Sequence, residues 1–116
     1  MKALIILNDA PYGNERPFNG LRLAGSMGGK EGVNLKVFLI GDAAACAHKG
    51  QKVPSGYYNV QTMLGAVAKH GGIIGVCGSC MDARGIVEAD LVEGAHRSSM
   101  DELTAWTLEA DNIITF

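Results

Sequence analysis

The chain has 116 residues, of which 47% are hydrophobic and 19% are charged, and its formal net charge at neutral pH is -2. This length is enough for one hydrophobic core and too short for two, so we expect a single domain over residues 1–116. Acidic and basic residues are interspersed without runs of one sign, which argues against a nucleic-acid-binding protein.

The first apolar run is Ala3–Leu7, and Asn8 follows it directly. A continuous run of this kind is typical of a strand that is covered on both faces, as in parallel sheets. The run is too short for the hydrophobic region of a signal peptide and far too short for a membrane span. We therefore expect a cytoplasmic protein with no membrane partner.

Strands and helices alternate along the rest of the chain. Hydrophobic runs between turn residues predict further strands at Leu35–Ile40, Ile73–Val76 and Asn112–Phe116, with a weaker strand signal around Val92–Ala95. Periodic apolar residues and end signals predict helices from about Glu15 to Gly28 with Pro17 in the first turn, over Ala43–His48, from Asn59 to Gly71, and from Ser99, which opens a capping box with Glu102. Because parallel strands need crossover connections, this alternation predicts an α/β fold with helices on both faces of a parallel sheet.

Polar residues and cysteines follow several of the predicted strands. In sheets of this class, ligands and catalytic groups collect at the carboxyl ends of the strands. The residues expected at that edge are Asn8–Asp9, Gly41–Asp42, Cys77–Gly78 and, after the weaker strand, His96–Arg97. The sequence therefore places the pair Cys77 and Cys80 at the edge where a site is expected.

The two cysteines stand at a predicted junction between a strand and a short helix. Ser79 and Asp82 have the spacing of an N-cap and its N3 partner, so we expect the helix to begin at Cys80. Backbone N–H groups would then point towards both sulfurs and favour the thiolate, which is the nucleophilic form, and we expect the Cys77 sulfur to be accessible. The pattern also fits Cys77 as a small buried residue that ends a strand.

The cysteine pattern argues against a metal site and against a framework of structural disulfides. A structural zinc site needs four ligands, and CGSC supplies two with no second CxxC or HxxxH pair to complete them, so we expect no metal. Three cysteines in a chain with no export signal indicate thiols that are kept reduced. Cys46, in an alanine-rich segment, is expected to be buried and inert.

A thioredoxin-type dithiol has a similar signature, because C-G-x-C before a helix occurs in that family. In that family the pair follows an early strand and a later cis-proline faces it. Here the pair follows the third predicted strand, and no proline occurs after Pro54. The predicted topology therefore does not match thioredoxin.

The segment CGSCMDARG, residues 77–85, resembles the cysteine segment of the DsrE/DsrF-like family, which includes small sulfur-relay subunits of the Tus type. The segments VFLIGDA, GQKVPSGYYNVQTML and MDELTAWTLEADNIITF also resemble that family, so the similarity covers nearly the whole chain. The resemblance implies a three-layer α/β/α sandwich around a mostly parallel five-stranded sheet. It also implies assembly as a homotrimer or homohexamer.

In the sulfur-relay members, a cysteine at the end of the third strand carries sulfur as a persulfide, and its position corresponds to Cys77. The resemblance thus implies a sulfurtransferase-like carrier that uses no cofactor. Cys77 would accept sulfur from a persulfide donor and yield it to an acceptor, each a protein or a small thiol. Cys80 is the second candidate catalytic residue, and Arg84 and Arg97 are candidates for stabilising the anionic sulfur.

Two other functions remain open from the sequence. Cys77 and Cys80 could form a dithiol–disulfide redox or sensing site that carries no added sulfur. If Cys77 does carry a persulfide, the nearby Cys80 thiol could attack it, release sulfide and leave a disulfide, which would turn a carrier into a reductase-like or sensing protein. Alternatively, the chain could be a non-catalytic oligomeric module that binds a ligand at the strand ends, with cysteines that have no chemical role.

Overall fold

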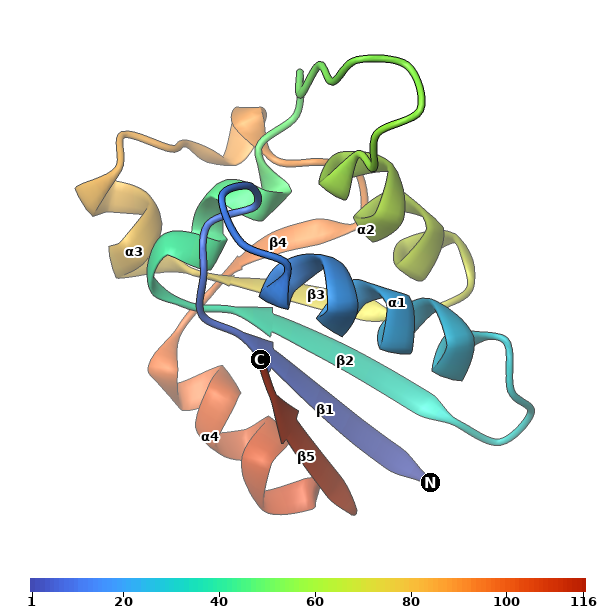
Figure 1. Cartoon of the computed structure of the whole chain (residues 1–116). Coiled ribbons are helices and arrows are strands. Elements are labelled where there is room, and N and C mark those ends of the chain that lie inside the picture. Colours follow the sequence, from blue (N-terminus) through green and yellow to red (C-terminus); the bar gives the residue numbers. More distant parts are fainter.

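The structure is a computed structural model that describes residues 1–116, and it has the predicted α/β fold (Figure 1). The strands are β1 (Lys2–Leu7), β2 (Asn34–Leu39), β3 (Ile73–Cys77), β4 (Ala95–Ser98) and β5 (Asn112–Thr115). The helices are α1 (Arg16–Gly28), α2 (Val60–Lys69), α3 (Gly78–Ala83) and α4 (Met100–Glu109), with 3-10 turns η1 (Gly41–Ala47) and η2 (Glu88–Asp90). None of the helices has the length and apolarity needed to span a bilayer.

The five strands form one sheet in the order β4-β3-β2-β1-β5, and every neighbouring pair is parallel. The chain moves in one direction from β1 to β4 and then returns past β1 to add β5. Because crossovers between parallel strands are right-handed, the return connection must cover the opposite face of the sheet. Accordingly, α1 and α2 pack on one face and α4 on the other (Figure 1).

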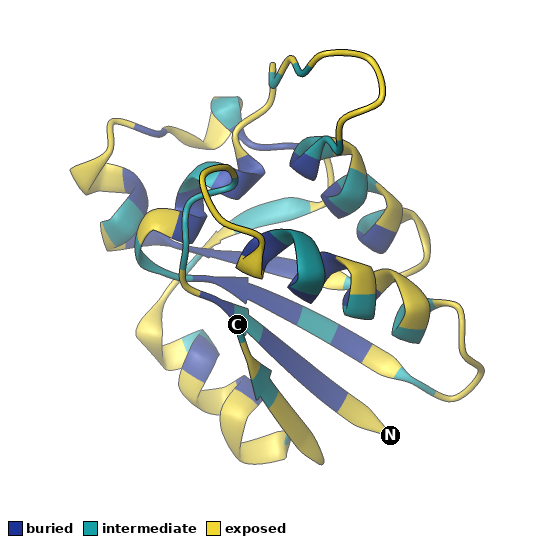
Figure 2. Ribbon diagram, in the orientation of Figure 1, coloured by how far each residue is buried: buried dark blue, intermediate teal, exposed yellow.

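Each central strand contributes alternate side chains to two separate cores. The larger core lies beneath α1, α2 and η1 and includes Ile5, Val37 and Ile74. The smaller core lies beneath α4 and consists of Leu4, Phe38, Cys77, Leu103 and Trp106. Figure 2 shows the buried central strands between partly exposed helices. Cys77 therefore points to the face that only α4 covers.

Local end signals account for most helix boundaries. Pro17 lies in the first turn of α1, and the Asn59 side chain caps α2 by accepting a hydrogen bond from the Thr62 N–H at 3.1 Å. Ser99 caps α4 in the same way, accepting from the Glu102 N–H at 3.2 Å. The predicted capping box is only half formed, because the Glu102 carboxylate instead accepts a hydrogen bond from the Ser98 hydroxyl.

The weakly predicted strand was placed too early in the sequence. The expected range was Val92–Ala95, whereas β4 runs from Ala95 to Ser98. Gly94 has φ +90°, and the Ala95 N–H donates to the Val92 carbonyl at 3.1 Å, so these residues form a turn. Val92 contributed to the apolar strand signal, but its side chain belongs to the larger core and not to a strand. As a consequence, Arg97 lies within β4 and not after it.

Candidate functional site

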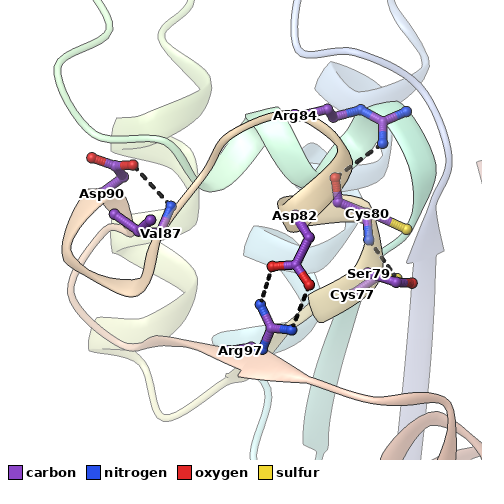
Figure 3. A network of polar contacts seen from close by, with 8 residues as sticks. All are labelled: Cys77, Ser79, Cys80, Asp82, Arg84, Val87, Asp90 and Arg97. Atoms are coloured by element: carbon purple, nitrogen blue, oxygen red, sulfur yellow. Dashed lines mark hydrogen bonds and ion pairs between the residues drawn. The ribbon is translucent and has the colours of Figure 1, made fainter.

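Cys77 is the last residue of β3 and also the N-cap of α3 (Figure 3). Its Sγ accepts a hydrogen bond from the Cys80 N–H at 3.4 Å, and the Ser79 hydroxyl lies 3.4 Å from the same sulfur. The helix thus begins at Gly78, two residues before the predicted start, because the sulfur of Cys77 takes the capping position that the sequence assigned to Ser79.

Gly78 lets the strand turn directly into the helix. A Cβ at this position would lie 2.9 Å from the Arg97 guanidinium carbon and 2.9 Å from the Ser98 carbonyl oxygen. Both contacts are closer than real Cβ atoms allow, so only glycine fits without a shift of the backbone. Gly78 therefore permits the close packing of α3 on β4 that brings the Cys80 N–H to the Cys77 sulfur.

The second sulfur contacts a different element. Cys80 Sγ accepts a hydrogen bond from the Gly41 N–H at 3.2 Å, at the start of η1. Gly41 has φ +60°, a conformation that glycine adopts without strain. The sequence placed Gly41 at the correct edge of the sheet but gave no sign that its N–H reaches a sulfur, because that contact depends on β2 and β3 being neighbours.

The two sulfurs differ in exposure and protonation. Cys77 is only 8% exposed, so it is less accessible than we predicted from the sequence, whereas Cys80 is partly exposed. Burial raises the pKa of the Cys77 thiol, but hydrogen bonds from the Cys80 thiol, the Ser79 hydroxyl and the backbone N–H groups outweigh it and hold this pKa below its ordinary value. Burial and the hydrogen bond to Cys77 raise the pKa of Cys80. Cys77 is therefore the better thiolate of the pair.

The two predicted supporting arginines lie on either side of α3 (Figure 3), and each forms an ion pair with an aspartate. Arg97 donates to both carboxylate oxygens of Asp82 at 2.8 and 3.0 Å. Arg84 donates to Asp42 at 2.6 Å and to the Cys80 carbonyl at 3.0 Å. Neither guanidinium hydrogen-bonds to a sulfur. Arg97 offsets the negative charge of Asp82, and the Arg84 charge lowers the pKa of Cys80.

The third cysteine has a different environment. Cys46 is fully buried in the larger core, its Sγ lies 3.7 Å from the Asp9 carbonyl oxygen, and burial raises its pKa to about 12. This confirms the prediction that Cys46 is buried. All three cysteines are free thiols, and no group of three or more His, Cys, Asp or Glu side chains is arranged to hold a metal ion.

The two main cavities of the chain lie away from the cysteine pair. One, of about 600 Å³, lies between α2 and Gly94, and the other, of about 460 Å³, lies around the amino ends of β1, β2 and β3. Neither is lined by Cys77 or Cys80. The cysteine pair therefore lies outside both of these cavities, at the carboxyl edge of the sheet.

We expect the alkylation of Cys77 to reach half of its maximal rate at a lower pH than that of an ordinary thiol, because its pKa is lowered, and the alkylation of Cys80 to do so at a higher pH. The midpoint is the decisive quantity, because the low exposure of Cys77 also reduces its maximal rate. Iodoacetamide labelling across a pH series measures both midpoints when each cysteine is assigned from peptide fragment ions by mass spectrometry, since the two cysteines lie on one peptide. Cys46 is the internal control and should react only after unfolding. A Cys77 midpoint above that of Cys80 would contradict the assignment.

Comparison with known proteins identifies the family. The model of the DsrE/DsrF-like family matches residues 1–116. Protein YchN of Escherichia coli is 40% identical over 116 residues, covering 99% of this chain and 98% of the relative, and an uncharacterized protein of Methanocaldococcus jannaschii is 39% identical over the full length of both chains.

Solved structures show the same fold. The crystal structure of the Escherichia coli YchN protein superposes with a TM-score of 0.93, covering 99% of this chain and 98% of that one at 40% identity. A protein of unknown function from Methanobacterium thermoautotrophicum, 14% identical, has a TM-score of 0.77 over 99% of this chain and 98% of its own, which supports the fold alone. The chain therefore belongs to the DsrE/DsrF-like family.

Proposed function

We propose that this protein is a cytoplasmic sulfur-transfer protein that carries sulfur as a persulfide on Cys77. The observation that carries the proposal is the hydrogen bonding of the Cys77 sulfur, which accepts from the Cys80 N–H and lies within reach of the Ser79 hydroxyl. These groups stabilise a thiolate, and a thiolate is the species that attacks a donor persulfide. A reducing compartment keeps such a thiol available.

The sulfur transfer balances in atoms and electrons without a cofactor. The Cys77 thiolate attacks the outer sulfur of a donor persulfide, R–S–SH, and a bond forms between the two sulfurs. The S–S bond of the donor breaks, and the donor leaves as the thiolate R–S⁻. In the second half-reaction an acceptor thiolate attacks the outer sulfur on Cys77, which leaves again as a thiolate. The hydrogen bonds that activate Cys77 as a nucleophile also make it a good leaving group.

Donor and acceptor are proposed to be thiol proteins or small thiols. The limited exposure of Cys77 means that the donor must approach closely or that α3 must shift for the attack. As the family resemblance implies, the functional oligomer is proposed to be a homotrimer or homohexamer. In such an assembly, a neighbouring subunit would add residues near the two sulfurs.

The same contacts support a second candidate function. The Cys80 thiol hydrogen-bonds to Cys77 and lowers its pKa, so the two sulfurs are close enough to interact directly. A dithiol of this kind can cycle between the reduced pair and a disulfide without carrying sulfur. The two functions differ in whether an additional sulfur atom is ever bound to Cys77.

We expect the Cys77 peptide of the Cys80→Ser variant to become heavier by one sulfur after incubation with glutathione persulfide. Removing Cys80 leaves the bound sulfur without an intramolecular attacker, so the persulfide accumulates. The measurement is peptide mass spectrometry after mild alkylation. Cys77→Ser is the control, and it should carry no added sulfur on any peptide. Absence of the heavier Cys77 peptide in a folded Cys80→Ser protein would exclude the carrier function.

A further inference from the structure

We infer that Cys80 is a resolving thiol that attacks a persulfide on Cys77 and releases its outer sulfur as sulfide, which makes the protein a persulfide reductase. This inference rests on the proposed loading of Cys77 with sulfur and adds a second step to it. It assigns different roles to the two cysteines: Cys77 receives the sulfur, and Cys80 removes it.

The first argument is position. Cys77 is the N-cap of α3 and Cys80 the third helical residue, and the Cys80 N–H lies 3.4 Å from Cys77 Sγ. Side chains three residues apart at a helix start lie on the same side, with Cβ atoms about 5–6 Å apart. A disulfide needs Cβ atoms about 3.5–4.5 Å apart, so the first turn of α3 must also shift by about 1–2 Å to bring the sulfurs to bonding distance. Cys46 cannot take this role, because its side chain is enclosed in the core on the other face of the sheet.

The second argument is a separate donor for the second sulfur. The Gly41 N–H donates to Cys80 Sγ at 3.2 Å and comes from η1, so it is not one of the groups that hold Cys77. Arg84 lies on the same side, anchored by Asp42 and by the Cys80 carbonyl, and adds positive charge. The Gly41 N–H and the Arg84 charge both lower the pKa of Cys80, although burial and the contact with Cys77 outweigh them in the unloaded protein.

The third argument is that loading Cys77 activates Cys80. In the unloaded protein, burial and then the hydrogen bond to Cys77 raise the pKa of Cys80, and the charge on Cys77 contributes in the same direction. When Cys77 carries an additional sulfur, its Sγ becomes a divalent sulfur that accepts a hydrogen bond more weakly than a thiolate, so it holds the Cys80 proton less strongly. The Gly41 N–H and the Arg84 charge, which lower this pKa, then act with less opposition.

The step balances in atoms and electrons. The Cys80 thiolate attacks Cys77 Sγ, and a disulfide forms between the two residues. The bond from Cys77 Sγ to the outer sulfur breaks, and its electron pair leaves with that sulfur as HS⁻. The outer sulfur is reduced to sulfide, and the two cysteines are oxidised. A dithiol reductant restores the pair: it attacks the more exposed Cys80, and Cys77 leaves as the stabilised thiolate.

The test mixes the reduced full-length protein with an equimolar amount of glutathione persulfide, without added reductant. We expect one sulfide per chain, measured with a sulfide electrode, and one disulfide between Cys77 and Cys80, located by mass spectrometry. The rate constant of sulfide release after loading should not depend on protein concentration, since the attack is intramolecular. A release rate constant that rises with protein concentration would overturn the assignment.

The Cys80→Ser variant separates this inference from the proposed function. We expect it to load Cys77 and to lose the release of sulfide, and Cys80→Ala should repeat the result if serine disturbs folding. If Cys80→Ser loads Cys77 while the loaded wild-type protein keeps its sulfur, the carrier function stands and the resolving role is wrong. If Cys77 is not loaded in either variant, both proposals fail.

Substitution of Arg84 tests the activation of Cys80. Arg84→Gln should slow the release of sulfide more than it slows the loading of Cys77, and Arg84→Lys, which keeps the charge, should recover part of the release rate. Arg16→Gln is the matched control: it breaks an exposed ion pair with Asp9 outside the contacts of α3 and should leave both rates unchanged. Equal release rates in wild type and Arg84→Gln would remove Arg84 from the proposal.

Discussion

Replacement of Trp106 by alanine should lower the free energy of unfolding by about 3–5 kcal/mol. The indole is only 7% exposed and packs edge-to-face against Phe38, with ring centroids 6.0 Å apart. It also covers Gly75 so closely that a Cβ there would lie 2.9 Å from the ring. Because the core beneath α4 has only five buried residues, no neighbouring side chain can fill the space left by the ring.

Leu108→Ala is the matched control for this prediction. Leu108 belongs to the same helix but is 82% exposed, so its truncation should change the free energy of unfolding by no more than about 0.5 kcal/mol. Urea unfolding followed by far-ultraviolet circular dichroism measures both variants. Tryptophan fluorescence is unsuitable, because Trp106 is the only tryptophan of the chain. Equal losses in the two variants would show that α4 does not form a core as described.

Gly78→Ala should lower the free energy of unfolding by about 1–3 kcal/mol and should also shift the alkylation of Cys77 to higher pH. The new Cβ would meet the Arg97 side chain, which can move, and the Ser98 carbonyl oxygen, which is part of β4 and cannot. The start of α3 must therefore move away from β4. This movement lengthens the hydrogen bond from the Cys80 N–H to the Cys77 sulfur, so the thiolate loses part of its stabilisation.

Gly25→Ala provides the control with the opposite sign. Gly25 lies within α1, and a Cβ there meets no atom within 4 Å. Alanine is favoured over glycine in a helix by about 0.5–1 kcal/mol, so this variant should be more stable than the wild type and should leave the Cys77 midpoint unchanged. Chemical denaturation and the pH series of alkylation give both quantities. A Gly78→Ala protein with wild-type stability and an unshifted midpoint would contradict the close packing of α3.

The core beneath α4 affects both the stability of the fold and the environment of the Cys77 sulfur. Cys77 belongs to the cluster that Trp106 and Leu103 complete. Substitutions beneath α4 should therefore alter the exposure of the Cys77 sulfur as well as stability. Substitutions in the larger core on the other face, for example at Leu64, should affect stability first, because that core contains neither sulfur of the pair among its buried residues.

The sequence by itself determined the order and type of the elements. Each has a local cause: the apolar run of β1, Pro17 in the first turn of α1, the Asn59 cap of α2 and the Ser99 cap of α4. Such signals act between residues a few positions apart. The position of the cysteine pair at the carboxyl edge followed from the same reasoning, because every strand in a parallel sheet ends at that edge.

The tertiary structure decided what surrounds each sulfur. The Gly41 N–H that reaches Cys80 is 39 residues away in the chain, and Asp42, which anchors Arg84, is 42 residues from it. These contacts exist because β2 and β3 are neighbours, and strand order is set by packing of whole elements and not by local preference. The low exposure of Cys77 has the same origin, since the packing of α4 against the sheet covers the sulfur and no residue near it in the sequence could indicate this.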